Sequence, residues 1–266
     1  MSTASLRSEV QRLRGRRRHR DEVPEDRVEF ARSVGLEPDD WQRDVLRSEK
    51  TRLLLNCARQ SGKSTVAAII ALHRALRDRS SLILVLAPSE RQAKETFGKL
   101  TAFYRRLGHP VPSSSYRKMG LELMNGSRVE ALPGTEKTVR GFSAVDLLVL
   151  DEAARVDDAL YHAIRPMLAV SGGRLIMMST PWGKRGVFHQ EWVEGIGWER
   201  YEIPASQSPR IPEAFLEEER RTLGRWFFEQ EYACIFGENI DAVFRHEDIR
   251  AAVTDDFAPL FGSGVG

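Results

Sequence analysis

A short stretch of the chain carries the residue types that bind phosphate groups. The apolar run Leu53 to Leu55 precedes a polar segment with a Gly-Lys-Ser triplet, and a helix-favouring segment follows. Backbone N–H groups of a tight loop at a helix N-terminus can surround triphosphate oxygens without bulk. Lys63 adds a compact positive charge, and the Ser64 hydroxyl is a ligand for Mg²⁺. The predicted nucleotide-binding residues of this P-loop are Gln60, Ser61, Gly62, Lys63, Ser64 and Thr65.

The P-loop pattern is incomplete at one position. The usual motif has a Gly five places before Gly62, where this chain has Cys57. The bare Gly-Lys-Ser triplet also occurs by chance at solvent-facing helix starts. The apolar strand before the loop therefore carries the assignment, together with the rest of the chain.

An acidic pair supplies the second half of an ATPase site. The apolar run 145–150 ends in Asp151 and Glu152, about ninety residues after the P-loop. We expect Asp151 to hold the hydration shell of Mg²⁺, and Glu152 to orient and polarise the attacking water. An acidic helix cap explains such a pair equally well when it stands alone, but much less well beside a P-loop.

Phosphoryl transfer also requires positive charge where oxygens gain negative charge, and two arginines are candidates. Arg59 lies inside the phosphate loop, so it would act within its own subunit. Arg140 directly precedes the strand that ends in the acidic pair. An ordinary surface ion pair explains Arg140 as well, and the sequence leaves open whether it acts within or between subunits.

Three polar residues are further candidates. Ser179 and Thr180 end an apolar run at the carboxyl edge of the expected sheet, where ligands bind. They could sense the γ-phosphate and move the next loop, although a plain strand-end turn fits equally well. Gln42 lies upstream of the P-loop, and its amide matches the donor and acceptor of an adenine edge. Taken alone, Gln42 is more often a surface residue.

The elements around these residues alternate between strands and helices. Continuous apolar runs predict buried parallel strands, and Asn125-Gly126 predicts a hairpin within 121–132. The fold class is therefore α/β, a P-loop NTPase of the ASCE or RecA-like type with a mainly parallel sheet flanked by helices. The segment 107–118 is expected to be a loop. Expected strands are 53–55, 81–87, 145–150, 174–179 and 198–203, and expected helices are 25–34, 41 onward, 66–76, 90–104, 157–168, 187–193, 213–223 and 225–236.

Composition limits the class of protein. Of the 266 residues, 41% are hydrophobic and 29% charged, as in a globular chain, and no apolar run is long enough to cross a bilayer. Cys57 and Cys234 lack metal-type spacing, which favours a reducing intracellular compartment, and the six scattered histidines argue against zinc.

Residues 1–20 hold seven arginines and one acid, which leaves 33 basic and 37 acidic residues elsewhere. Nucleic-acid contacts are therefore expected from local patches or from that arm, unless the arm is an idle solvated tail.

Four segments are expected. A basic arm at 1–24 precedes an ATPase core at 25–204. A small helical lid or linker subdomain follows at 205–245, after a Ser- and Pro-rich connection, and a tail occupies 246–266.

Together these motifs resemble the ATPase domain of the large terminase subunit of tailed bacteriophages, over about residues 36–245. The arginine inside the P-loop and the missing first Gly are typical of that family. The matching segments are Trp41-Gln42, 58–64, Val139-Arg140-Gly141, 147–152 and 178–181.

The resemblance implies an ATP- and Mg²⁺-dependent motor that packages double-stranded DNA into a procapsid. It implies a homo-oligomeric ring, usually of five subunits, docked on the portal protein in the host cytoplasm, with a small terminase subunit as partner. Lys63, Ser64 and Asp151 match nucleotide and Mg²⁺ residues, and Glu152 the catalytic carboxylate. Arg59 matches the P-loop arginine, Arg140 a finger reaching the neighbouring subunit, and Ser179 with Thr180 the coupling motif.

One departure from the family is large. Its members carry a second, RNase H-like nuclease domain, and about twenty residues after Phe244 cannot fold one. This is then either a piece of a longer protein or a motor half made separately, and DNA cleavage by this chain is not expected. A helicase-like ATPase is the nearest alternative, although a helicase core usually needs a second similar domain. A nucleotide-binding scaffold without turnover is the other alternative, disfavoured by Glu152 and both arginines.

Overall fold

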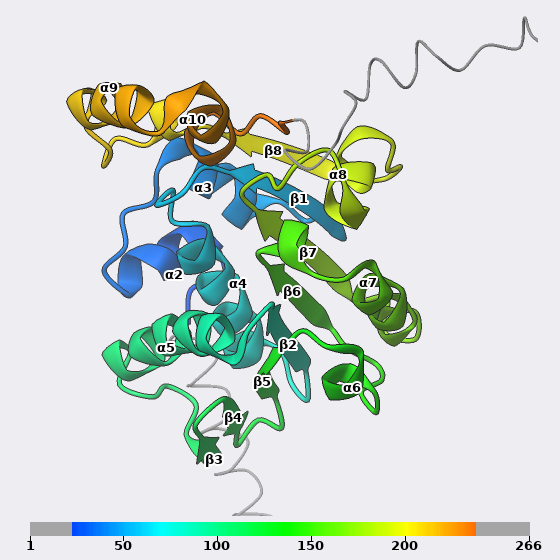
Figure 1. Ribbon diagram of the computed structural model, residues 1–266. Coiled ribbons are helices and arrows are strands. Elements are labelled where there is room, and N and C mark those ends of the chain that lie inside the picture. Colours follow the sequence, from blue (N-terminus) through cyan, green and yellow to red (C-terminus); the bar gives the residue numbers. More distant parts are fainter. Residues whose placement is uncertain (1–22, 238–266) are drawn as a thin grey trace, which may run out of the picture.

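The computed structural model describes residues 23–237, and its centre is one eight-stranded sheet. The strand order is β3-β4-β5-β2-β6-β7-β1-β8, with the six strands from β5 to β8 parallel and β3 and β4 antiparallel (Figure 1). The mainly parallel sheet predicted from the sequence is confirmed. The strands are β1 (Arg52–Cys57), β2 (Leu82–Ala87), β3 (Ser113–Arg117), β4 (Gly120–Leu123), β5 (Arg128–Pro133), β6 (Leu147–Asp151), β7 (Arg174–Ser179) and β8 (Glu199–Ile203).

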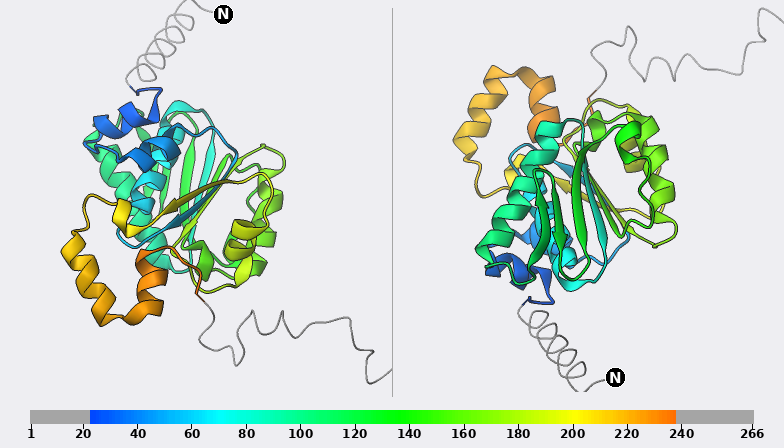
Figure 2. Two further views of the ribbon diagram at one scale, coloured as in Figure 1. Left: turned by 90° about the horizontal axis from the view of Figure 1, so that it is seen from above. Right: turned by 90° about the horizontal axis from the view of Figure 1, so that it is seen from below.

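Helices cover both faces of the sheet, which is why its central strands are apolar throughout. Alternate residues of one strand enter different cores: Leu53 and Leu55 pack with α2 to α5, whereas Leu54 packs with α7 and α8. Figure 2 shows the sheet between these two layers. The helices are α2 (Arg27–Ser33), α3 (Asp40–Arg47), α4 (Lys63–Arg77), α5 (Glu90–Arg106), α6 (Glu136–Val139), α7 (Asp158–Ile164), α8 (Gly186–Val193), α9 (Glu213–Thr222) and α10 (Gly224–Tyr232), with short 3₁₀ turns η1 (Ala153–Arg155), η2 (Arg165–Leu168) and η3 (Ala205–Gln207).

The sequence prediction was wrong in one segment and imprecise in two. Residues 107–118 are not all loop, because β3 pairs with β4 at the exposed edge of the sheet. Its serines show no apolar alternation, so the pairing partner and not the sequence pattern makes it a strand. The expected helix 157–168 changes to 3₁₀ geometry at Arg165-Pro166, where proline removes a backbone donor, and α10 ends four residues early. The predicted hairpin around Asn125-Gly126 is confirmed by the antiparallel β4 and β5.

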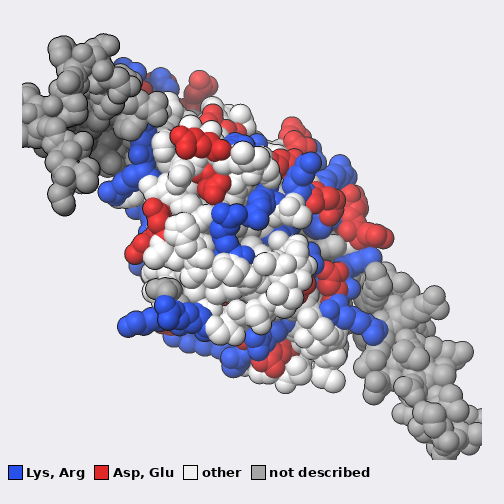
Figure 3. All heavy atoms as spheres, turned by 90° about the vertical axis from the view of Figure 1, so that its right-hand side faces the viewer, with Lys and Arg blue, Asp and Glu red and all other residues white. Residues whose placement is uncertain are grey.

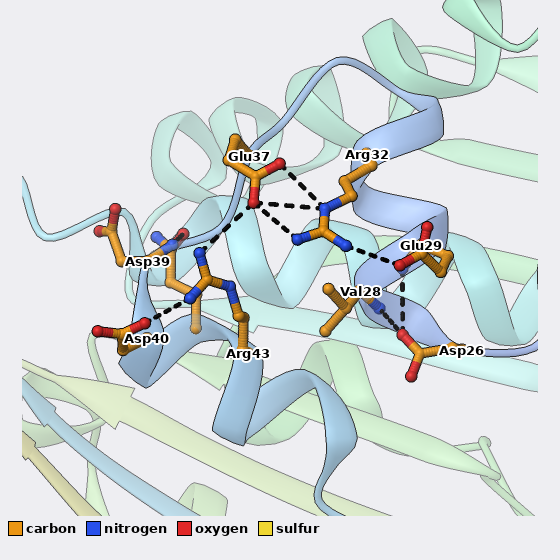
Figure 4. A network of polar contacts seen from close by, with 9 residues as sticks. Asp26, Val28, Glu29, Arg32, Glu37, Asp39, Asp40 and Arg43 are labelled. Carbon is orange, nitrogen blue, oxygen red and sulfur yellow. Dashed lines mark hydrogen bonds and ion pairs between the residues drawn. The ribbon is translucent and has the colours of Figure 1, made fainter.

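The connection between α2 and α3 is held by a surface network of ion pairs (Figure 4). The guanidinium of Arg32 contacts Glu29 at 2.7 Å and Glu37 at 2.9 Å, and Arg43 contacts Glu37 and Asp40. Such exposed pairs contribute little each, but together they fix the short turn before α3. That turn sets where α3 begins, and α3 packs on α4, the helix of the phosphate loop.

Helices α9 and α10 pack on each other and form a small unit beside the main body (Figures 1 and 2). Ala58, Ala205 and Cys234 form a separate small core between this unit and the strand ends. We call α9 and α10 with the connection before them, residues 205–237, the lid. The expected arm up to residue 22, the end of the expected lid segment and the expected tail lie outside the described residues.

Charges are mixed on the face of the molecule seen in Figure 3. Basic side chains there lie in small groups separated by acidic and uncharged ones. This agrees with the near balance of charge outside the first twenty residues. Within residues 23–237 no helix is long and apolar enough to cross a bilayer.

Candidate functional site

A cleft of about 1240 Å³ lies at the carboxyl ends of the central strands. It is built from the loop after β1, the end of β6, the start of α5 and the lid. Strand β7 lies between β1 and β6, so the phosphate loop and the acidic pair are one strand apart at the same edge. The cleft is lined by Arg59, Gln60, Ser61, Gly62, Lys63, Ser64, Thr65, Ser89, Arg91, Gln92, Glu95, Thr96, Lys99, Asp151, Glu152, Arg155, Thr180, Arg210, Ile211, Pro212, Phe215 and Tyr232.

The backbone of the phosphate loop explains where glycine is needed. Gly62 has φ +96°, and a Cβ there would lie 2.9 Å from the Gln42 amide nitrogen, so a side chain would be both strained and crowded. Gln60 also has a positive φ of 59°. Cys57, by contrast, is still a strand residue paired with Ile203, so the position where the motif usually has glycine needs no special conformation here. The Cys57 departure therefore leaves the loop intact.

Two contacts join the phosphate loop to the acidic pair. Lys63 Nζ lies 3.1 Å from Glu152 Oε1, and the Ser64 hydroxyl donates to Asp151 Oδ2 at 3.0 Å. Thr96, from α5, donates to the same Asp151 oxygen at 2.9 Å. Lys63 is 9% exposed and Asp151 4%, so these charges meet in a largely desolvated position. Such an arrangement can bind an anion and a hard cation side by side.

The electrostatics of this cluster follow from burial. Burial alone would lower the pKa of Lys63, but Glu152 and Asp151 outweigh it and the pKa is raised. Lys63 is therefore charged at neutral pH. Burial raises the pKa of Asp151, and Glu152 adds to this against the opposing pull of Lys63, Thr96 and Ser64. Burial, the largest cause, thus favours the protonated form of Asp151 over its charged form.

The residues present fit a magnesium ion that arrives with a substrate. No group of three His, Cys, Asp or Glu side chains able to hold a metal occurs among residues 23–237. Mg²⁺ commonly binds through one or two protein oxygens and takes its other ligands from water and phosphate. Ser64 and Asp151, in contact with each other and facing the cleft, supply that number of oxygens.

Glu152 has an unusual backbone. Its φ is +53° and ψ +43°, in the left-handed region that a residue other than glycine adopts at a cost of about 1–3 kcal/mol. Its N–H donates to Asp151 Oδ1 at 3.0 Å, which helps to hold the turn. The turn brings the Glu152 side chain into the cleft instead of back along the strand.

The lid contacts the phosphate loop at several points. Arg59 N–H donates to the Glu231 carbonyl at 3.0 Å, and the Arg59 guanidinium forms an ion pair with the Glu231 carboxylate. Arg210 donates to the Ser61 carbonyl at 2.8 Å and forms an ion pair with Asp39 at 2.7 Å. Movement of the lid therefore cannot occur without changing contacts of the phosphate loop.

Three predicted site residues lie away from the cleft lining. Gln42 is 1% exposed, and its Oε1 accepts from the Asp39 N–H at the start of α3, so in this structure its acceptor serves a helix cap. Ser179 is fully buried, and only Thr180 of the pair reaches the cleft. Arg140 is exposed, just after α6 on the face covered by α7. The other predicted residues all line the cleft.

Among the residues missed by sequence reasoning, four contact the phosphate loop or the acidic pair: Thr96, Arg155, Arg210 and Glu231. Arg155 had a signal, because it follows Glu152 by three residues, a spacing that places side chains together on a helical turn. Thr96, Arg210 and Glu231 carry no local motif, since their places depend on how α5 and the lid pack.

Comparison with known families decides what this cleft belongs to. Residues 54–251 match the family model described as "Terminase large subunit, T4likevirus-type, N-terminal". The chain belongs to the terminase large subunit family. The match covers both the phosphate loop and the acidic pair.

Curated relatives carry the same family name. The chain is 29% identical over 173 residues to the large terminase subunit of Thermus phage G20c, covering 58% of this chain and 36% of that protein. It is 25% identical over 244 residues to the large subunit of Escherichia phage T5, covering 84% of this chain and 55% of that protein. This terminase chain therefore spans about a third to a half of the length of these relatives.

Solved terminase structures share the fold. The ATPase domain of the Thermus phage P74-26 large terminase superposes with a TM-score of 0.69 at 23% identity, over 78% of this chain and 97% of that one. The large terminase of a thermophilic bacteriophage, solved in complex with ADP, gives a TM-score of 0.64 at 12% identity, over 75% of this chain and 54% of that one. The predicted P-loop fold class is confirmed.

The buried carboxylate of this terminase chain gives a first prediction. Because burial and Glu152 raise the pKa of Asp151, the folded chain binds a proton there more tightly than the unfolded chain does. At neutral pH the ionised Asp151 carboxylate therefore lowers the free energy of unfolding. When the pH falls below the raised pKa, Asp151 becomes protonated and this cost disappears. Asp151→Asn should raise the Tm of the nucleotide-free chain by about 2–4 °C near neutral pH, the shift given by ~1 kcal/mol in a domain of this size.

Calorimetry over a pH series measures this effect. The gain should shrink as the pH falls through the raised pKa of Asp151. Asp157→Asn is the matched control, because either side chain can cap α7, and its Tm should change by less than ~1 °C. A lower Tm for Asp151→Asn near neutral pH would show that its contacts outweigh the burial cost.

Proposed function

We propose that this chain is an ATP-hydrolysing motor domain that translocates double-stranded DNA into a viral procapsid. The observation that carries the proposal is the Lys63–Glu152 contact beside the Ser64–Asp151 contact, across one cleft. It joins a phosphate-binding cation, a metal-binding pair and a general base candidate. The ADP bound to the related large terminase of a thermophilic bacteriophage supports a nucleotide as ligand.

Each residue has one role in the proposed reaction. The phosphate loop from Gln60 to Thr65 binds the phosphates, and Lys63 neutralises the charge of the transferred group. Ser64 and Asp151 would hold Mg²⁺, which when bound neutralises phosphate charge as a Lewis acid. Glu152 orients and polarises the attacking water. Arg59, at the rim of the phosphate loop, adds positive charge from the same subunit.

The remaining roles concern assembly and coupling. Thr180 and Ser179 would couple the state of the cleft to the loop after β7, and Gln42 would contact the adenine after releasing its cap contact. The proposed partners are double-stranded DNA, the portal protein, a small terminase subunit and further copies in a ring of about five, in the host cytoplasm. The proposed segments are the core 25–204 and the lid segment 205–245. The membership of the family supports these assignments.

Arg140 gives the second prediction and tests the motor proposal. Because Arg140 is exposed and does not line its own cleft, it would act in the cleft of a neighbouring subunit. Arg140→Ala should leave ATP binding unchanged. In a full ring it should lower the ATP turnover per chain by about 10³-fold, which removes the rise that accompanies assembly. Phosphate release at increasing protein concentration measures this.

Mixing variants separates action within and between subunits. In a mixture of Arg140→Ala and Glu152→Ala chains, some clefts combine a native Glu152 with a neighbour's native Arg140, so activity should partly return. No return in mixed assemblies would refute a finger between subunits. Wild-type chains that bind ATP but release no phosphate at any concentration would favour a non-hydrolysing scaffold.

A further inference from the structure

Arg155 occupies a position that none of the assigned roles explains. It lies three residues after Glu152, at the end of the short turn η1, and it lines the cleft. Its Nε is 3.9 Å from Glu152 Oε2 and its Nη2 is 3.6 Å from Glu231 Oε1. The side chain is 28% exposed, so it is partly shielded from solvent.

The guanidinium of Arg155 also stacks on an aromatic ring. Its central carbon lies 3.9 Å from the centroid of the Trp182 ring, within the range of a strong cation–π contact. Trp182 comes two residues after Thr180, in the loop that follows β7. Arg155 therefore touches the loop of the proposed coupling residues as well as the catalytic carboxylate.

Glu231, on helix α10 of the lid, forms ion pairs with two arginines. Its carboxylate pairs with Arg59 of the phosphate loop through one oxygen and with Arg155 through the other. The Glu231 side chain is only 12% exposed, so the pair is partly desolvated. A guanidinium binds carboxylate and phosphate through the same planar fork, so a phosphate group could replace Glu231 on Arg155.

We propose that Arg155 binds the γ-phosphate from within its own subunit, and that Glu231 occupies Arg155 until a triphosphate displaces it. This inference rests on the proposed ATPase function. A diphosphate lacks the displacing group, so it would leave the Glu231 contacts in place. Triphosphate binding would thus separate Arg155 from Glu231 on α10 and at the same time shift the Arg155–Trp182 stack.

A purely structural role for these residues makes a different prediction. If Arg155 only held Trp182, and Glu231 only fastened the lid, substitutions would affect ADP and a triphosphate equally. The ratio of the two affinities therefore separates the roles, because it cancels effects on folding and on the shared part of the ligand.

The test is calorimetric titration of the full chain with ADP and with ATPγS, each with Mg²⁺. Arg155→Ala should weaken ATPγS about 10-fold and ADP less than about 2-fold, as expected for the loss of one charge-assisted contact. Glu231→Gln should strengthen ATPγS about 3- to 10-fold with little change for ADP, because it removes the competing charge. The double variant should lose this gain.

Matched controls come from the same kinds of contact elsewhere. Arg165→Ala removes a cation–π contact with Tyr161 outside the cleft, and Glu229→Gln removes an ion pair with Arg225 on α10. Both should leave the ATPγS-to-ADP ratio unchanged. Arg155→Lys keeps the charge and should recover part of the ATPγS affinity if Arg155→Ala folds poorly.

An unchanged ratio in Arg155→Ala, or unchanged or weaker ATPγS binding in Glu231→Gln, would overturn the inference while leaving the ATPase proposal standing. A wild-type chain that binds neither nucleotide would overturn both.

Discussion

Replacing Glu152 with glutamine should lower kcat for ATP hydrolysis by about 10²–10⁴-fold while ATP still binds. The substitution keeps the shape of the side chain but removes its ability to polarise water. Glu152 is held in the cleft by its left-handed backbone, with Lys63 3.1 Å away. Single-turnover phosphate release, with ATPγS binding measured on the same samples, checks both halves of the prediction.

The control for Glu152 is another carboxylate of the same cleft. Glu95 lines the cleft from α5 and lies 3.8 Å from Lys99 in an exposed pair. Glu95→Gln should change kcat by less than about 3-fold, because exposed pairs contribute little. Equal rates for wild type and Glu152→Gln would end the assignment of Glu152 as the catalytic carboxylate.

Replacing Lys63 with alanine should abolish tight nucleotide binding, with the affinity for ATPγS and Mg²⁺ falling at least about 100-fold. The loss has two sources. The phosphates would lose a buried cation, and Asp151 and Glu152 would lose the charge that offsets their mutual repulsion. Titration calorimetry measures the affinity directly.

Lys99 provides the comparison for Lys63. It lines the same cleft, but 35% of its side chain is exposed, against 9% for Lys63, and it pairs with Glu95 on its own helix. Lys99→Ala should weaken ATPγS less than about 3-fold, because its charge is screened by solvent. Similar losses for the two lysines would mean that general positive charge, and not the buried contact, binds the phosphates.

The strands of the fold were predictable because burial on both faces makes them continuous apolar runs. Strand β7 was located to the residue, and β2 and β6 to within two residues at each end. Strand β3 was missed since its residues are polar and mostly exposed, so only its pairing with β4 identifies it. Sequence patterns therefore predict buried strands well and polar strands at the edge of a sheet poorly.

The site was predictable where chemistry depends on neighbours in sequence. The phosphate loop and the acidic pair each follow an apolar run that forms a buried strand, and the backbone of the loop requires Gly62. Glu231 could not be found in this way, because it contacts Arg59 across about 170 residues of chain. The cap contact of Gln42 with Asp39, by contrast, is local, and the residues around it could have indicated it.

A structure of the Glu152→Gln chain with ATP and Mg²⁺ would show whether the phosphate loop and the acidic pair bind one nucleotide between them. We expect a triphosphate in the cleft with its γ-phosphate in contact with Lys63, and Mg²⁺ beside Ser64 and Asp151. A triphosphate bound elsewhere, or one that leaves Asp151 and residue 152 on the far side of the protein from its phosphates, would contradict this expectation.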